Sequence, residues 1–124
     1  MLEHDFDNME LTMRRCQTFE LELLYRYSGL DPSEIKAYYK EVSPYCKLRT
    51  IEVGFPLDAT DNASSNATGE TQKPKLVFIH GYGASGATFW RIMKPLSEHY
   101  HVIFLDMPGM GGSTRVPFFC KTVE

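Results

Sequence analysis

Two short apolar runs constrain the fold of this chain more than any other feature of its sequence. They occupy residues 76–79 and 102–105, and a glycine-rich stretch and an amphipathic segment separate them. Continuous apolar runs of this length are typical of strands that are covered on both faces, as in parallel sheets. Between the runs, Phe89, Met93 and Leu96 recur at helical spacing. The order strand, helix, strand therefore predicts two adjacent parallel strands joined by a helix that carries its aromatic residues inward.

The segment before the first run has a different pattern. Residues 7–27 lack Gly and Pro, and their apolar residues recur at helical spacing, which predicts a helix. Asp31 then offers an N-cap, Pro32 sits at the favoured first helical position, and an acidic residue follows. This combination predicts a second short helix over residues 32–42. We therefore expect an N-terminal helical segment over residues 1–47.

Three further segments complete the expected organisation of the chain. Residues 48–55 alternate apolar and polar side chains, the pattern of a half-buried first strand. Residues 56–74 contain mainly Asp, Asn, Ser, Thr, Gly and Ala, and too few bulky apolar groups to offset their ordering entropy. We expect a mobile loop there. The remaining residues, 75–124, are expected to form a partial α/β core.

Composition excludes several function classes. The chain has 124 residues, a hydrophobic content of 43%, a charged content of 23% and a formal net charge of -3, which is typical of a globular protein. It has no long basic run, so we expect no basic surface that would attract the phosphates of a nucleic acid. No apolar stretch approaches the ~20 residues that a transmembrane helix needs.

The cysteines and the N-terminus indicate the cellular compartment. Cys16, Cys46 and Cys120 are odd in number, far apart and without a C-x-x-C pair, so neither a disulfide framework nor a zinc site is expected. The acidic N-terminal sequence has no secretory signal pattern. We expect a cytoplasmic protein with reduced thiols and no bound metal.

The glycine-rich loop after the first apolar run permits two chemistries. Its pattern Gly81-x-Gly83-x-x-Gly86 matches the dinucleotide fingerprint, and Asp106 stands 20 residues further on, at the end of the next apolar run. In a Rossmann-type unit the glycines would admit a pyrophosphate and Asp106 would hold a ribose hydroxyl. This dinucleotide-binding alternative stays open at the level of sequence.

The second chemistry uses more of the residues. The loop His80-Gly81-Tyr82-Gly83, the pair Phe89-Trp90 and the turn that begins Asp106-Met107-Pro108-Gly109 and continues to Ser113 closely resemble the α/β-hydrolase superfamily. The resemblance extends from residue 75 to residue 115. Within the superfamily the chain is most similar to the abhydrolase branch of lysophospholipases and lysophosphatidic acid acyltransferase-like proteins, and residues 49–53 match the opening hairpin of that branch.

The resemblance implies roles for residues in both loops. The backbone N–H of Tyr82 would be one donor of an oxyanion hole, which stabilises the negative charge of a tetrahedral intermediate. His80, Gly81 and Gly83 would support that loop. The turn after the second apolar run would be formed by Asp106, Gly109, Gly111 and Ser113, which are expected to be structural. The implied fold class is α/β, an incomplete hydrolase-type sheet preceded by N-terminal helices.

The sequence also departs from the family pattern. It contains no G-x-S-x-G, and the family's acid and base normally lie further along the chain than Glu124. We therefore expect the N-terminal portion of a protein acting on an ester or lipid, as a carboxylic ester hydrolase or a lysophospholipid acyltransferase, and inactive alone. No cofactor is expected. A non-catalytic interaction protein is the third alternative, and the sequence identifies no protein or membrane-surface partner.

Overall fold

One four-stranded sheet, with both helices on the same face, organises the residues that the structure describes, 3–56 and 72–115. The structure is a computed structural model. Its elements are, in order, α1 (Glu3–Tyr27), β1 (Ile35–Ser43), β2 (Cys46–Val53), β3 (Lys75–Ile79), α2 (Trp90–His99) and β4 (His101–Leu105). Single 3-10 turns, Pro32–Glu34 and Gly86–Phe89, precede β1 and α2.

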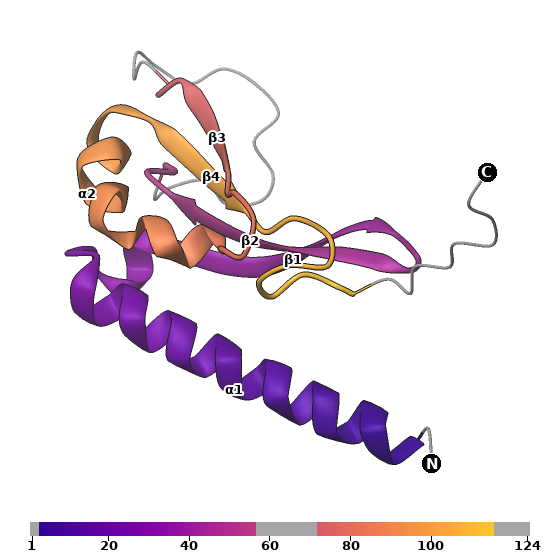
Figure 1. Ribbon diagram of the computed structural model, residues 1–124. Coiled ribbons are helices and arrows are strands. Elements are labelled where there is room, and N and C mark those ends of the chain that lie inside the picture. Colours follow the sequence, from indigo (N-terminus) through magenta and orange to yellow (C-terminus); the bar gives the residue numbers. More distant parts are fainter. Residues whose placement is uncertain (1–2, 57–71, 116–124) are drawn as a thin grey trace.

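The sheet has the strand order β1-β2-β4-β3 (Figure 1). β1 and β2 form an antiparallel hairpin, and β2 pairs antiparallel with β4. β3 and β4 are parallel, with Leu76 opposite Val102 and Phe78 opposite Phe104. The predicted pair of adjacent parallel strands joined by a helix is therefore confirmed.

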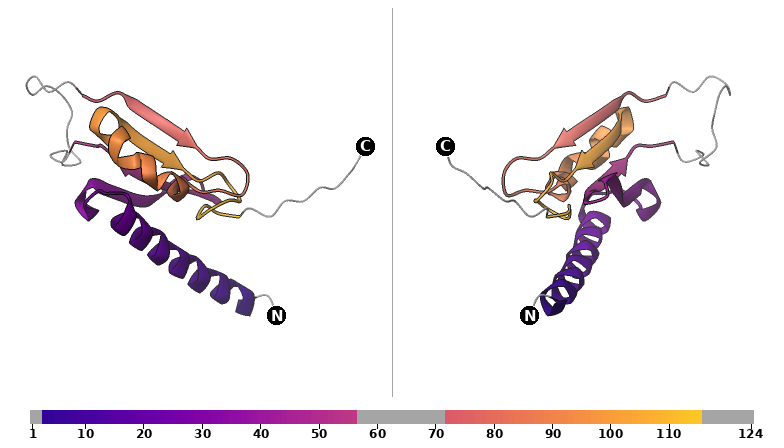
Figure 2. Two further views of the ribbon diagram at one scale, coloured as in Figure 1. Left: turned by 60° about the vertical axis from the view of Figure 1, so that its left-hand side comes forward. Right: turned by 90° about the vertical axis from the view of Figure 1, so that its right-hand side faces the viewer.

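The hydrophobic core contains residues of the sheet and of both helices, and Figure 2 shows these helices beside the sheet. Every second residue of the central strands points to this face, since Ile51 pairs with Phe104 and Val53 with Val102. All four are buried, as are the helix residues that cover them: Leu24 and Met93. Each buried aliphatic or aromatic side chain contributes roughly 1.5–3 kcal/mol of transfer free energy.

The aromatic residues between β3 and β4 point inward, as expected. The Phe89 ring lies 5.3 Å from the Phe78 ring and 5.8 Å from the Phe104 ring, centroid to centroid. The Trp90 ring lies 5.9 Å from that of Tyr27, at the end of α1. These contacts join α1, α2 and the sheet into one packed layer.

The opposite face of β3 corrects one expectation. The apolar run 76–79 predicted a strand covered on both faces, but Val77 is 52% exposed and Ile79 is 60% exposed. An apolar run identifies side chains that are suited to burial. A strand face is buried only where another element packs against it. The described residues supply no element that covers this face.

The helix predicted over residues 32–42 is wrong. Asp31 and Glu34 do form a capping box, with Pro32 at the start of the turn, but it begins only a single 3-10 turn. From Ile35 onward the chain is β1, whose first residues alternate between core and solvent. Eight of the nine residues of β1 pair with β2, and this tertiary context overrides the local helix-start signal. The strand predicted at 48–55 is thus the second strand of the hairpin.

The other segment predictions have different outcomes. The first helix ends at Tyr27, close to Gly29, which has a φ of 77°. The loop predicted over residues 56–74 lies mostly outside the described residues.

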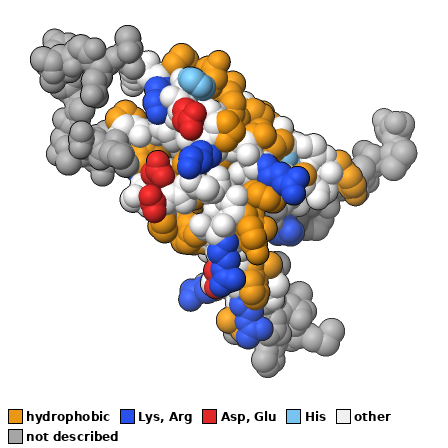
Figure 3. Space-filling view, turned by 90° about the vertical axis from the view of Figure 1, so that its left-hand side faces the viewer, with side chains coloured by type: hydrophobic (Ala, Val, Ile, Leu, Met, Phe, Trp, Pro, Cys, Tyr) orange, Lys and Arg blue, Asp and Glu red, His pale blue; other side chains and the backbone are white. Residues whose placement is uncertain are grey.

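On the face in Figure 3, the described hydrophobic side chains are interspersed with charged side chains of both signs. Among the described residues, no helix has the length and apolar character that a bilayer crossing requires.

Candidate active site

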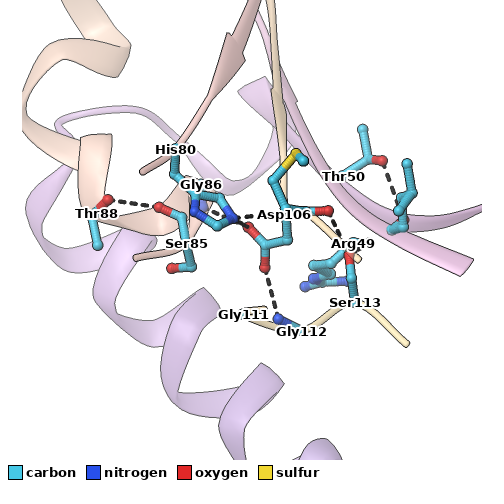
Figure 4. Close-up of polar contacts among 12 residues, drawn as sticks. Arg49, Thr50, His80, Ser85, Gly86, Thr88, Asp106, Gly111, Gly112 and Ser113 are labelled. Carbon is cyan, nitrogen blue, oxygen red and sulfur yellow. Dashed lines mark hydrogen bonds and ion pairs between the residues drawn. The ribbon is translucent and has the colours of Figure 1, made fainter. Parts of the chain in front are cut away.

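The two glycine-rich loops meet at one edge of the sheet. They follow β3 and β4, and parallel strands bring the loops at their carboxyl ends together. Figure 4 shows both loops converging on the side chain of Asp106. This convergence is the centre of the candidate site.

The Asp106 carboxylate holds the two loops together. Its Oδ1 accepts the Gly86 N–H at 2.5 Å, and its Oδ2 accepts the Gly112 N–H at 2.7 Å. Asp106 is 1% exposed, so these charge-assisted hydrogen bonds form away from water. Gly111 is required here, because a Cβ at that position would lie 2.1 Å from Asp106 Oδ2. Asp106 is therefore committed to backbone groups.

His80 connects the loop after β3 to the end of β4. Its Nε2 accepts the Met107 N–H at 3.0 Å, so Nε2 carries no proton. Nδ1 must then carry the proton, and it lies 2.8 Å from the Gly81 carbonyl oxygen, to which it donates. His80 Nε2 also lies 4.0 Å from Asp106 Oδ1, but in this tautomer the two groups share no proton. They do not form an acid–base pair.

The backbone around Tyr82 forms a tight turn at the end of β3. The Ala84 N–H donates to the Gly81 carbonyl at 3.3 Å, and Gly83 at the third position has a φ of 72°, as a type II turn requires. The Tyr82 side chain is 97% exposed. Among the residues that the structure describes, the Tyr82 N–H has no hydrogen-bond partner, so this donor is free to face a ligand.

The glycines beside Tyr82 differ from what the sequence suggested. Gly81 and Gly83 were both expected to support the loop that contains Tyr82. Gly83 has the positive φ that a side chain resists. Gly81 has neither a positive φ nor a neighbour that a Cβ would meet within 4 Å. The turn therefore requires a residue that tolerates a positive φ at position 83, and not at position 81.

One family model matches the part of the chain that contains this arrangement. Residues 74–118 match the family described as alpha/beta hydrolase fold. Those residues contain both loops and the strand-helix-strand unit. This segment belongs to the alpha/beta hydrolase fold family. The sequence-based assignment to that superfamily is confirmed.

Two curated relatives and one solved structure are similar to this chain. A probable 1-acylglycerol-3-phosphate O-acyltransferase of Oryza sativa is 46% identical over 55 residues, which are 44% of this chain and 13% of that protein. A pimeloyl-[acyl-carrier protein] methyl ester esterase of Aeromonas salmonicida is 43% identical over 42 residues, 34% of this chain and 16% of the relative. A lipase structure from Acinetobacter baumannii has a TM-score of 0.55 at 24% identity, covering 85% of this chain and 28% of that one.

The relatives are much longer than the chain, which spans about an eighth of the acyltransferase. The match to the lipase structure shows the fold alone. The incomplete α/β-hydrolase fold expected from sequence is therefore what the chain contains, with esterase and acyltransferase relatives.

The structure argues against the dinucleotide-binding alternative, because the residue that would bind the ribose is already used. That alternative required the Asp106 carboxylate to accept a ribose hydroxyl, but both carboxylate oxygens already accept backbone N–H groups. The Gly86 N–H also donates to the Asp106 carboxylate, so it is not available to a pyrophosphate.

The two serines in the hydrolase loops have different environments. Ser113 is fully buried, and its hydroxyl donates to the Asp106 carbonyl at 2.7 Å while accepting the Arg49 N–H at 2.8 Å. Ser85 is half-buried and precedes the turn at Gly86, where its carbonyl accepts the Thr88 N–H. In the described part of the chain, no three His, Cys, Asp or Glu side chains converge as a metal site requires.

Sequence reasoning missed a buried ion pair that docks α1 against the hydrolase core. Arg49 Nε and Nη2 both donate to Glu20 Oε2, at 2.9 and 2.7 Å. Burial raises the pKa of Glu20, and the facing guanidinium offsets part of that rise. Arg49 also stacks over the Tyr39 ring, 5.3 Å from its centroid. A helix residue and a strand residue 29 positions apart give no local signal of such a pair.

Proposed function

We propose that this chain supplies the oxyanion-loop half of a catalytic site acting on an ester or lipid acyl group. The reaction would be that of a carboxylic ester hydrolase or a lysophospholipid acyltransferase. The observation that carries the proposal is the turn at Tyr82, at the carboxyl end of β3, whose backbone N–H has no hydrogen-bond partner among the described residues. The relatives named above, an acyltransferase and an ester-cleaving enzyme, support the same class of chemistry.

The chemistry follows from the geometry of this loop. A tetrahedral intermediate of acyl transfer develops negative charge on the former carbonyl oxygen, and a fixed N–H donor stabilises that charge without reorganising. His80 and Asp106 fix the loop from behind through the Met107 and Gly86 amides. Neither has a proton-transfer role in this proposal.

Catalysis also requires a nucleophile, a base and a group that orients the base. The 124 residues contain no G-x-S-x-G, so we propose that a longer form of the protein supplies these groups and that the present chain alone turns over no ester. The free thiols of Cys16 and Cys46 fit a reducing compartment, and we propose a cytoplasmic location.

The first test is the coding sequence beyond Glu124, where an in-frame G-x-S-x-G is expected. In that longer form, Gly83→Val should lower kcat on the order of a hundredfold, because a β-branched residue resists the φ of 72° and the Tyr82 donor is displaced. The measurement is steady-state hydrolysis of a p-nitrophenyl ester, with the 124-residue chain as the blank.

Two matched variants sharpen this test. Tyr82→Phe should leave kcat nearly unchanged, since the phenol is exposed to solvent and only the backbone acts. Gly81→Ala should also be mild, because Gly81 has no positive φ and room for a Cβ. A Tyr82→Phe variant as damaged as Gly83→Val would mean that the phenol participates, and the proposal would fail in its present form.

A second candidate is a non-catalytic interaction protein built on the same half-fold. The observation that favours it is the exposed apolar side chains of Val77 and Ile79. It requires that the longer reading frame contain no nucleophile, so the same coding sequence decides between the two candidates.

A further inference from the structure

One side of α1 carries a stripe of exposed apolar side chains. Cys16, Phe19 and Leu23 are all exposed, and Phe19 is 69% exposed. They follow one another after three and then four residues, which is the spacing of the positions along which one helix packs against another. From Cys16 to Leu23 the stripe is roughly 10 Å long, from the helical rise per residue. The sequence of α1 thus provides a short seam that is suited to a second helix.

The stripe lines a groove between α1 and the two glycine-rich loops. The groove encloses about 540 Å³, and its opposite wall includes Ser85 and Gly111. Figures 1 and 2 show that α1 runs away from the sheet towards its N-terminus, and Figure 4 shows α1 passing beside the loops. A second helix can therefore lie along the stripe, with the loops as its other neighbour.

Two charged residues of opposite sign flank the stripe. Arg15 immediately precedes Cys16 and Glu22 immediately precedes Leu23, so both charges lie on the same side of the stripe. Both are exposed, and within residues 3–56 and 72–115 neither makes an ion pair. Charges at these flanking positions determine which helices pair and in which orientation.

The signs of these charges favour an antiparallel pair of α1 helices. In such a pair the flanking positions on the same side of each seam face each other. Arg15 of one copy then lies opposite Glu22 of the other, and the two-fold symmetry repeats this contact. In a parallel pair Arg15 would instead face Glu20, which is already bound to Arg49.

We propose that two copies of this chain pair through α1, with the two helices antiparallel and related by a two-fold axis. Cys16 of each copy packs against Phe19 of the other, and Arg15 of each forms an ion pair with Glu22 of the other. The helix of the second copy fills the groove beside Ser85 and Gly111. This pairing does not depend on the proposed function.

The test reverses the two charges and measures dimerisation of the 124-residue chain by sedimentation velocity. Every variant carries Val77→Lys, because Val77 is an exposed apolar residue of the edge strand β3 and could add a second contact. Arg15→Glu and Glu22→Arg should each weaken the dimer at least tenfold, since each places like charges opposite one another twice. The two changes in one chain should restore the dimer to about the parent affinity.

A mixture and a control exclude an effect on folding. An equimolar mixture of the Arg15→Glu and Glu22→Arg variants should form a heterodimer, because every facing pair then has opposite charges. Lys40→Glu makes a charge reversal at an exposed position of β1, and should leave dimerisation unchanged. Phe19→Ala removes the ring from the centre of the seam and should weaken the dimer at least tenfold.

Three outcomes would overturn the proposal. They are a Val77→Lys chain that stays monomeric at every concentration, a doubly reversed chain that dimerises as weakly as the single variants, and a mixture that forms no heterodimer. None of them affects the kinetic comparison of Gly83→Val with Tyr82→Phe, so the pairing can fail while the proposed function stands.

Discussion

The Asp106 carboxylate accepts N–H groups from two loops while it is almost completely shielded from water. Buried carboxylates are costly unless their lone pairs are used, and hydrogen bonds to a charged group contribute about 1.5–3 kcal/mol each. Ser113 adds a third connection by joining the Asp106 carbonyl to the Arg49 N–H. At the scale of single residues, Asp106 and Ser113 therefore tie the two loops of the candidate site together through backbone groups.

Replacing Asp106 by Asn should destabilise the chain on the order of 3 kcal/mol. An amide keeps one acceptor oxygen but turns an NH2 group towards the second backbone N–H, which then loses its partner. Urea denaturation followed by Trp90 fluorescence measures the loss, and amide hydrogen exchange at Gly86 and Gly112 should accelerate. Asp31→Asn is the control, because Asn serves equally well at an exposed N-cap. Unchanged exchange at both glycines would contradict the supporting role of Asp106.

At the scale of elements, a polar cluster joins three strands on the face of the sheet away from the helices. Glu52 of β2 lies between Tyr38 of β1, which donates a hydrogen bond to it, and His101 of β4, whose Nε2 is 2.8 Å from Glu52 Oε2. Burial alone would raise the pKa of Glu52, but the hydrogen bonds from Tyr38 and His101 and the nearby Lys36 charge lower it. Burial and Glu52 together raise the pKa of Tyr38 to about 12, so this donor stays protonated in ordinary buffers.

The lowered pKa of Glu52 predicts a pH-dependent stability. A carboxyl group with a depressed folded-state pKa stabilises the fold above its unfolded value, here 4.5, and loses that contribution as the pH falls through the folded value. Glu52→Gln should therefore lower the free energy of unfolding at pH 7, and the difference from the parent should shrink below pH 4.5. Urea denaturation at both pH values measures it, with Glu98→Gln on the exposed side of α2 as the control. A difference that is the same at both pH values would contradict the cluster.

At the scale of the whole molecule, strand β3 has both an unpaired edge and an exposed apolar face. β3 is the last strand of the sheet, and its residues Val77 and Ile79 are more than half exposed. Unpaired strand edges with apolar side chains tend to pair with other chains, and charged residues on them prevent this. The molecule is therefore expected to self-associate at β3.

Val77→Lys should weaken self-association of the 124-residue chain at least tenfold by placing a charge on this face. Sedimentation velocity over a concentration series measures the effect. Val42→Lys is the matched control, since Val42 has a similar exposure, 56%, and lies in β1 at the other end of the strand order. A parent chain that remains a monodisperse monomer at every concentration would show that the covered face of the sheet is sufficient for stability.

The sequence by itself determined the strand-helix-strand unit and the two glycine-rich loops that meet at the candidate site. The runs 76–79 and 102–105, with the glycines that follow each, specify these features locally, because period, length and turn residues act over a few positions. It also identified Tyr82 and Asp106 as residues of interest. The hydrogen-bond partners of Asp106 could not be read in the same way, since both are backbone amides brought close by folding.

Only the tertiary structure decided the state of residues 35–43, the ion pair between Glu20 and Arg49 and the groove beneath the loops. Each depends on contacts between segments that are distant in the chain. The cap signals at Asp31 and Glu34 were real, but hydrogen bonds to β2 continue over eight paired residues and outweigh one local turn. Local helix propensity contributes little free energy per residue. Where it competes with strand pairing and burial in the sheet, pairing and burial determine the structure.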